Sequence, residues 1–352
     1  MTNKEPKVSF IKPSRPLNGP VKLDRLRQAH NIISKIETTV FVDANILISM
    51  EKVMKKGGKY AHLKEHGLQS FVRFLNSSPQ VGLSPGLGLT EMPPERAAFS
   101  QEAYEAFCKK FLSGYLDATN ATQVKFSGRS GDYGFFDIGD EFKALIAVSF
   151  ASFIYLFIID SKPNKDRLAM YASYLALIEE NVGVLSHMEV QIARFCLSEP
   201  LCTSITAVDI RRKLRANFIK YDGRLPRSVD DVLKIAFNAA CDIRLINTAN
   251  IIDQNGVDGV NQDCWIATQD AKLALLCDFV YHTNLDGEVG KYAVSEIIHD
   301  DESNPYWKLS EEVLISRLRD REANGRKNFP TDPDALVRLA FKAIEDLKTH
   351  FR

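Results

Sequence analysis

The chain has 352 residues, enough for a sizeable hydrophobic core and for two or more structural units. Its 45 basic and 45 acidic side chains balance, so no global positive field indicates a nucleic-acid partner, although local patches are compatible with this total. The 6 cysteines form no CxxC pair and the 7 histidines are not spaced with them as ligand sets. These features argue against a zinc site and favour a reducing, cytoplasmic setting.

Residues 1–37 predict an N-terminal arm followed by a helix. The opening stretch MTNKEPKVSFIKPSRPLNGP is broken by prolines and lacks the apolar core of a signal peptide. Residues 22–36 then show helical spacing of apolar side chains.

Residues 38–94 begin with TTVFVDANILISM, in which a β-branched, apolar run meets Asp43 and then an apolar helix pattern. A carboxylate where a buried strand gives way to a helix lies at the carboxyl edge of a sheet, where open α/β sheets build ligand sites. A helix N-cap is the alternative explanation for Asp43. Further along, the glycine-rich stretch VGLSPGLGLTEMPPE carries Glu91, for which simple solvation in a loop is the alternative.

Residues 95–229 contain no strand signals and predict a large helical insertion. Its most apolar run, ALIAVSFASFIYLFII at 144–159, is shorter than the roughly 20 residues of a membrane span. We expect a helix buried on all sides, and therefore a soluble protein without a membrane partner.

Residues 230–299 return to a mixed pattern, and residues 300–352 predict a helical C-terminal extension. A long helix carries Asp242 on an apolar face, where a salt bridge is the alternative explanation. The strand-like run CWIATQD ends in Asp270, for which a helix cap is the alternative, and AKLALLC and FVYHT follow as a helix and a strand. Strand, helix and strand with short links predict a parallel βαβ unit.

The order FVDANILI, GLTEM, NAACDIRLI, WIATQD resembles the PIN-domain nucleases. The resemblance covers roughly 40–100 and 230–300, and it implies a three-layer α/β/α core with a parallel sheet. It also implies that four carboxylates bind the metal and act in catalysis, with two polar residues in support. The four acids are Asp43, Glu91, Asp242 and Asp270, and the supporting residues are Asn45 and Thr268.

These residue types suit metal-dependent hydrolysis. Carboxylate oxygens are the hard ligands that Mg²⁺ or Mn²⁺ prefers, and two carboxylates at one sheet edge repel each other unless a cation compensates. Bound metal can activate a water for in-line attack on a phosphodiester without a covalent nucleophile. A rival register makes DCWIATQDAKLALL one helix, so that Asp263 and either Asn284 or Asp286 replace Asp242 and Asp270.

A basic, aromatic segment at 211–227 predicts contacts with a nucleic-acid backbone, with a solvated surface as the alternative. Its candidate phosphate contacts are Arg211, Arg212, Lys213, Arg215, Arg224 and Arg227. The resemblance implies an endonuclease that cuts RNA rather than DNA. The alternatives are a PIN-like binding or scaffolding protein without turnover, which would bind a protein partner or self-associate through the helical insertion, and a structure-specific DNA nuclease.

Overall fold

The computed structural model describes residues 7–15, 21–112, 133–163, 166–199, 205–220, 223–283, 294–297, 304–324 and 332–352. The chain divides into two compact units. The first unit consists of Met1–Tyr133 and Leu245–Val294, and the second consists of Gly134–Arg244 and Ser295–Arg352. The long helix α11 (Val229–Asn255) contributes residues to both.

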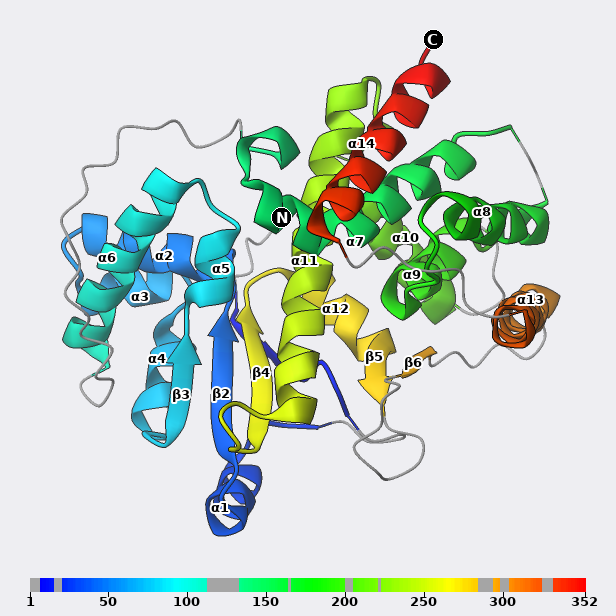
Figure 1. The fold of residues 1–352 in the computed structure, drawn as a ribbon. Helices are drawn as coiled ribbons and strands as arrows, with labels where there is room; N and C mark the ends of the chain where they lie inside the picture. Colours follow the sequence, from blue (N-terminus) through cyan, green and yellow to red (C-terminus); the bar gives the residue numbers. More distant parts are fainter. Residues whose placement is uncertain are drawn as a thin grey trace. The chain divides into compact units, whose positions relative to one another are not determined.

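The first unit contains a small, mostly parallel sheet. Its strands are β1 (Ser9–Ile11), β2 (Glu37–Val42), β3 (Val81–Ser84) and β4 (Gln262–Thr268), in the order β1-β4-β2-β3 (Figure 1). β2 is parallel to both β3 and β4, whereas β1 is antiparallel to β4. The expected mixed α/β class is therefore confirmed. β4 is buried at every position, as expected for a central strand of a sheet covered on both faces.

Seven helices of the described residues lie wholly in the first unit. They are α1 (Arg25–Ser34), α2 (Ala44–Lys55), α3 (Tyr60–Glu65), α4 (Gln69–Asn76), α5 (Gly86–Thr90), α6 (Pro94–Phe111) and α12 (Ala271–Phe279). The core joins strand residues such as Val40 and Trp265 to Tyr104 and Phe107 of α6. Thus α6 belongs to the first unit and shares its hydrophobic core with the sheet, whereas the sequence predicts an insertion that begins at residue 95.

Two expectations about the sheet edge are wrong. Part of the predicted N-terminal arm forms β1, and its Ser9 lies opposite Thr268 of β4. β5 (Val280–Thr283) therefore does not pair with β4 as a parallel βαβ unit; it forms a two-stranded sheet with β6 (Val294–Ile297). The reason is that β1 occupies the edge of β4 that β5 was expected to fill.

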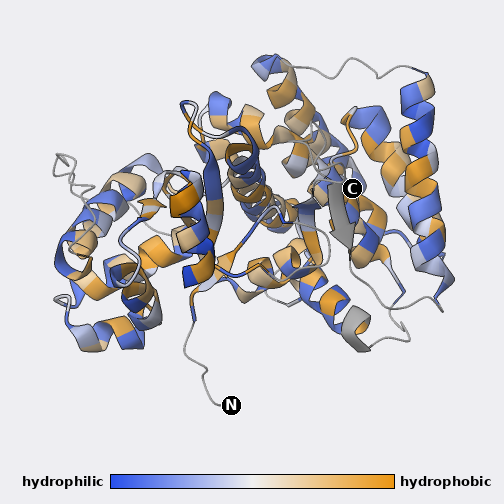
Figure 2. Cartoon of the chain, turned by 90° about the horizontal axis from the view of Figure 1, so that it is seen from below, coloured by the Kyte–Doolittle hydropathy of each residue, from blue (hydrophilic) through white to orange (hydrophobic). Residues whose placement is uncertain are grey.

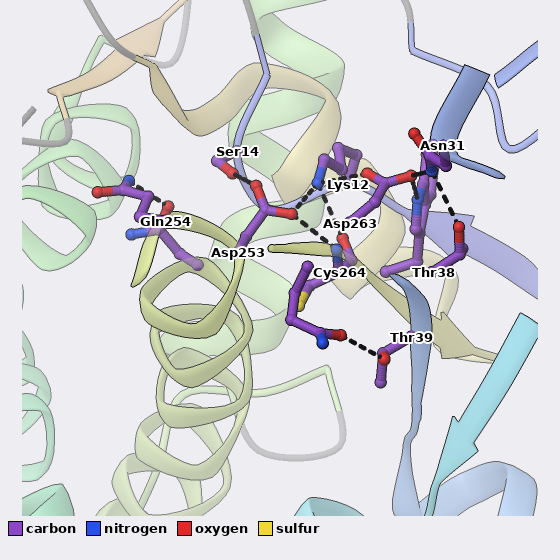
Figure 3. A network of polar contacts seen from close by, with 12 residues as sticks. Lys12, Ser14, Asn31, Thr38, Thr39, Asp253, Gln254, Asp263 and Cys264 are labelled. Atoms are coloured by element: carbon purple, nitrogen blue, oxygen red, sulfur yellow. Dashed lines mark hydrogen bonds and ion pairs between the residues drawn. The ribbon is translucent and has the colours of Figure 1, made fainter. Parts of the chain in front are cut away.

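A buried network of charges holds this N-terminal segment in place (Figure 3). The Lys12 ammonium group pairs with Asp253 and, at 2.9 Å, with Asp263. Arg27 makes two further hydrogen bonds to Asp263, of 2.8 and 2.7 Å. Burial opposes ionisation of Asp263, but the Arg27 bonds and the Lys12 charge outweigh it and hold the pKa of this carboxyl well below its usual range.

The described residues of the second unit are mainly helical, and the unit also contains residues 295–297 of β6. Its helices are α7 (Asp140–Asp160), α8 (Arg167–Asn181), α9 (His187–Leu197), α10 (Ile205–Phe218), α13 (Pro305–Ala323) and α14 (Pro333–His350), with a short 3-10 turn η1 (Phe135–Asp137). α14 packs along α7, where Tyr155 donates a 2.7 Å hydrogen bond to Asp346. The expected insertion and C-terminal extension therefore fold together, because α7 is apolar on every side and needs covering helices.

One helix of the described residues, α7, is long and apolar enough to cross a membrane. In the structure 78% of its most apolar window is buried by protein. Elsewhere hydrophobic and hydrophilic residues alternate around the helices, as expected for helices with one buried face (Figure 2). The burial of α7 is the pattern expected of a core helix.

Candidate acidic site at the carboxyl edge of the sheet

Asp43 is the only one of the four predicted acids that is buried. It directly follows β2 in an extended conformation and precedes α2, but its side chain makes no capping hydrogen bond to that helix. The carboxylate is only 5% exposed and accepts hydrogen bonds from Thr268 and Asn45. The capping explanation for Asp43 therefore fails, and its side chain faces the neighbouring strand end instead.

Thr268 and Asn45 hold the Asp43 carboxylate in one orientation. β2 and β4 run side by side in register up to Val42 opposite Ala267, which brings Thr268 beside Asp43. The Asn45 side-chain amide also donates to the Thr268 hydroxyl at 3.0 Å, and its oxygen accepts from the Gln269 N–H at 2.9 Å. The predicted supporting residues are thus brought together with the first predicted ligand.

Asp270 lies at the same edge but also caps a helix. Its Oδ1 atom accepts hydrogen bonds from the backbone N–H groups of Lys272 and Leu273 at the start of α12, at 2.7 and 3.2 Å. Its own N–H donates to the Thr268 hydroxyl at 2.9 Å. The capping explanation is therefore correct for Asp270, and both cap bonds use one of its two carboxylate oxygens.

The environment of Asp43 disfavours its negative charge. Burial raises the pKa of this carboxyl, the charge of Asp270 raises it further, and the hydrogen bonds from Thr268 and Asn45 oppose the shift without cancelling it. Within the described ranges, no ion pair joins Asp43 to a lysine, arginine or histidine. Asp43 is thus a buried acid whose charge lacks a basic counterpart in the described part of the chain.

Asp263 shows the opposite arrangement at the other end of β4. Because residues 262–268 form a strand, the rival helix through DCWIATQDAKLALL is wrong. The negative charge of Asp263 is neutralised by Lys12 and Arg27, so this aspartate has a structural role as the acid of a buried ion-pair network. The rival partners Asn284 and Asp286 lie outside the described residues.

Glu91 ends the short helix α5, which approaches Asp43 closely. A Cβ atom on Gly88 would lie 2.4 Å from the Val42 carbonyl oxygen and 3.0 Å from the Asp43 carbonyl carbon. Only glycine allows this contact between the helix and the strand end. Glu91 follows Gly88 by three residues, on the same side of the helical turn. The sequence analysis does not identify Gly88, although two glycines within GLGL are a pattern that indicates a close approach of the backbone.

We expect Gly88→Ala to destabilise the first unit by about 1–3 kcal/mol, because the new methyl group must displace the backbone at Asp43. Urea unfolding would measure this change. Gly86→Ala, in the same helix, is the matched control, since nothing lies within 4 Å of the Cβ that it would add. Equal stabilities of the two variants would contradict the close approach of α5.

Asp242 belongs to the second unit, where the Asn217 side-chain amide donates to it at 3.4 Å. Its membership in the acidic site stays a prediction. Over the described ranges, no group of three or more histidine, cysteine, aspartate or glutamate side chains could hold a metal ion. Among the other predicted acids, Asp270 is the one whose negative charge raises the pKa of Asp43 within the described residues.

Two of the predicted phosphate-binding arginines are engaged inside the second unit. Arg215 forms a bidentate ion pair with Asp160, with hydrogen bonds of 2.5 and 2.8 Å. It also donates a 2.8 Å hydrogen bond to the Cys196 carbonyl. Arg211 donates to the Ser198 carbonyl at 2.9 Å. These contacts fix α10 in the helical unit and give both arginines a structural role.

The other basic residues of this segment are more exposed. Arg212 and Lys213 both form surface ion pairs with Asp209 in the same helix. Arg224 and Arg227 are exposed. Exposed ion pairs of this kind contribute little stability, so Arg212 and Lys213 could exchange Asp209 for an external anion. Together with the exposed Arg224 and Arg227, they are the basic side chains of this segment that can reach an external ligand.

Gln269, which the sequence pattern does not identify as a site residue, connects the site to α2 and to the segment after α3. Its side chain accepts a 2.7 Å hydrogen bond from Ser49 in α2 and donates one of 2.8 Å to the His66 carbonyl. Its place between Thr268 and Asp270 was the only signal in the sequence. The edge is therefore a preformed polar site rather than a loose loop.

No protein-family model matches the chain, and no curated protein or solved structure matches it. What the site can do must therefore come from its own geometry. It presents a buried carboxylate oriented by a hydroxyl and an amide, with a second carboxylate beside it. Such a set can bind a hard cation or a proton.

Proposed function

We propose that the chain is a metal-dependent phosphodiesterase of PIN type that cuts RNA internally. The observation that carries the proposal is the state of Asp43, which is buried beside a second carboxylate and has no basic ion-pair partner in the described residues. A purely structural acid at such a position would be expected to have a counterion, as Asp263 has.

The residues fit Mg²⁺ or Mn²⁺. Mg²⁺ in phosphoryl-transfer sites is held by one or two carboxylates, with waters and substrate phosphates completing the shell. Asp43 would be the principal ligand, Asp270 would offer the oxygen not used in its helix cap, and Glu91 and Asp242 are further candidates. Thr268 and Asn45 would fix the ligand orientation. When bound, the metal supplies an activated water and stabilises charge on the phosphate.

A binding or scaffolding protein without turnover is the second candidate. It is favoured by the capping role of Asp270 and by the lack of a third acid next to Asp43 in the described residues. In that case Asp43 would be a buried carboxyl group without a bound metal ion. The two functions differ in whether Mn²⁺ binds.

Cleavage of labelled single-stranded RNA, with Mn²⁺ or with EDTA, tests the proposal. We expect cleavage only with Mn²⁺, and a loss of more than about 100-fold in Asp270→Asn, because a metal ligand loses its charge. Asparagine is as good a helix cap as aspartate, so this variant should fold normally. Asp258→Asn is the matched control, since this aspartate is exposed and its positive φ of 50° suits asparagine equally well.

Undiminished cleavage in EDTA would contradict the metal mechanism. Equal cleavage by Asp270→Asn and Asp258→Asn would remove Asp270 from the site. No rise in melting temperature with Mn²⁺, together with no cleavage of RNA, would favour the binding protein over the nuclease.

A further inference from the structure

A groove of about 540 Å³ lies in the first unit. One wall is formed by β1 and the residues that flank it, and others are formed by α4, α12 and the segment before α1. The groove is built entirely from described residues of one unit. It has a size in the usual range of ligand sites.

The groove is positively charged. Lys7, Arg15 and Lys22 line it, and within the described residues none of the three forms an ion pair. Lys12 also lines it, but its charge is already taken up by Asp253 and Asp263. Lys7 and Lys22 therefore have no ion-pair partner within the described residues, whereas Arg15 lies near the Asp278 carboxyl.

One carboxyl group, Asp278, also lines the groove. Burial raises the pKa of this carboxyl, although the charge of Arg15 partly opposes the shift. The Arg15 guanidinium donates a 2.6 Å hydrogen bond to the Asp278 backbone carbonyl and lies over the Tyr281 ring, 3.8 Å from its centre. Arg15 is thus held with its planar group in a fixed position.

Aromatic rings form part of the groove lining. Phe10 from β1 and Phe74 from α4 are both partly exposed, with ring centres 4.7 Å apart at an angle of 52°. Phe10 also stacks on the buried Phe71, which supports it from the core. Cations beside exposed rings are the combination that proteins use to hold the phosphates and bases of single strands.

Two walls of the groove belong to elements that adjoin the acidic site. Ser9, in the groove wall, lies opposite Thr268, so Lys7 comes two residues beyond the end of β4 at which Asp43 lies. Ala274, on another wall, is one helical turn after Asp270, and its N–H donates to the Asp270 carbonyl at 3.0 Å. A strand in the groove would therefore reach the sheet edge that carries both acids.

We propose that this groove binds a single-stranded polynucleotide, with phosphates on Lys7 and Lys22 and a base against Phe10 and Phe74. As a route to the acidic site the assignment rests on the proposed nuclease function, but binding in the groove is testable without cleavage. A duplex fits poorly, since its bases are stacked on each other and cannot reach the rings.

The test measures binding of a labelled 12-nucleotide single strand to the full chain by fluorescence anisotropy in EDTA. We expect Lys7→Gln with Lys22→Gln to weaken binding at least tenfold and to reduce the slope of log K against log salt by about 1.4, for two lost phosphate contacts. Phe74→Leu keeps an apolar side chain but removes the ring, and should weaken binding about tenfold. Lys64→Gln with Lys109→Gln is the charge-matched control, since both lysines are exposed and neither lines the groove.

Equal affinities of the groove variant and the control variant would overturn the proposal, and so would equal binding of a single strand and a duplex of the same length. Ribo- and deoxyribo-oligonucleotides are compared to identify the polynucleotide, and preferred single-strand binding of either one supports the groove. Groove-dependent binding without Mn²⁺-dependent cleavage would keep this assignment and reject the nuclease. Cleavage whose KM is unchanged in the groove variant would reject the groove and keep the nuclease.

Discussion

Asp43→Asn should abolish Mn²⁺-dependent cleavage, with a loss of more than roughly 1000-fold, while the protein stays folded. The loss should exceed the 10–100-fold typical of residues that merely support a metal ligand, because Asp43 would be a ligand itself. Asparagine has the shape of aspartate and can still accept hydrogen bonds from Thr268 and Asn45. Single-turnover assays would measure the loss, with Asp258→Asn as the unaffected control.

The same variant should be more stable than the parent protein in the absence of metal. The folded state raises the pKa of Asp43, so it binds the proton more tightly than the unfolded chain does. The parent protein therefore loses stability as pH rises from the ordinary aspartate range, about 4, through the raised value. Asparagine avoids this loss, and its advantage should be present at neutral pH and vanish near pH 3.

Melting temperatures with and without Mn²⁺ separate this explanation from simple disruption of the fold. The parent protein should gain about 2.7 kcal/mol of stability when Mn²⁺ is present at 100 times its Kd, and Asp43→Asn should gain little. A variant that is both inactive and destabilised without metal would contradict the functional interpretation of Asp43. It would then be a structural acid.

The part of the site nearest Asp43 could be predicted because it depends on local pattern. The sequence shows a strand pattern that ends in a carboxylate at two places, Asp43 and Asp270. Because the two strands are adjacent and parallel, their carboxyl ends lie together. Asn45 and Thr268 were predicted for the same reason, since each lies within two residues of an acid. The capping bonds of Asp270 were also foreseen as an alternative, because helix caps have a local signature.

The parts that could not be predicted depend on contacts between distant segments. Nothing in the sequence near Ser9 indicates that it pairs with Thr268, more than 250 residues later, and so displaces β5 from the sheet. The partners of Arg215 and Arg211 were missed for the same reason, since a run of basic residues does not reveal which of them face the core. The groove could not be predicted either, because a proline-broken segment has the pattern of an extended arm and does not indicate that residues 9–11 form β1.

Lys12→Met should destabilise the first unit by about 3–5 kcal/mol, because it leaves Asp253 and Asp263 buried with too little positive charge. The Lys12 side chain is only 6% exposed, and it also donates to the Cys264 carbonyl at 3.2 Å. Methionine fills a similar volume, so the loss would come from charge and hydrogen bonding. Arg27 would still neutralise part of the Asp263 charge.

Denaturant unfolding at several pH values would measure this effect, with Lys7→Met as the matched control. Lys7 is exposed and has no ion pair in the described residues, so its substitution should change stability by less than about 0.5 kcal/mol. The folded state lowers the pKa of Asp263, so the stabilisation from its cations is present above the ordinary aspartate pKa and is lost in acid. The difference between Lys12→Met and the parent should therefore be full at neutral pH and shrink below about pH 3. A difference that does not depend on pH would show that Lys12 stabilises the sheet by packing rather than by its charge.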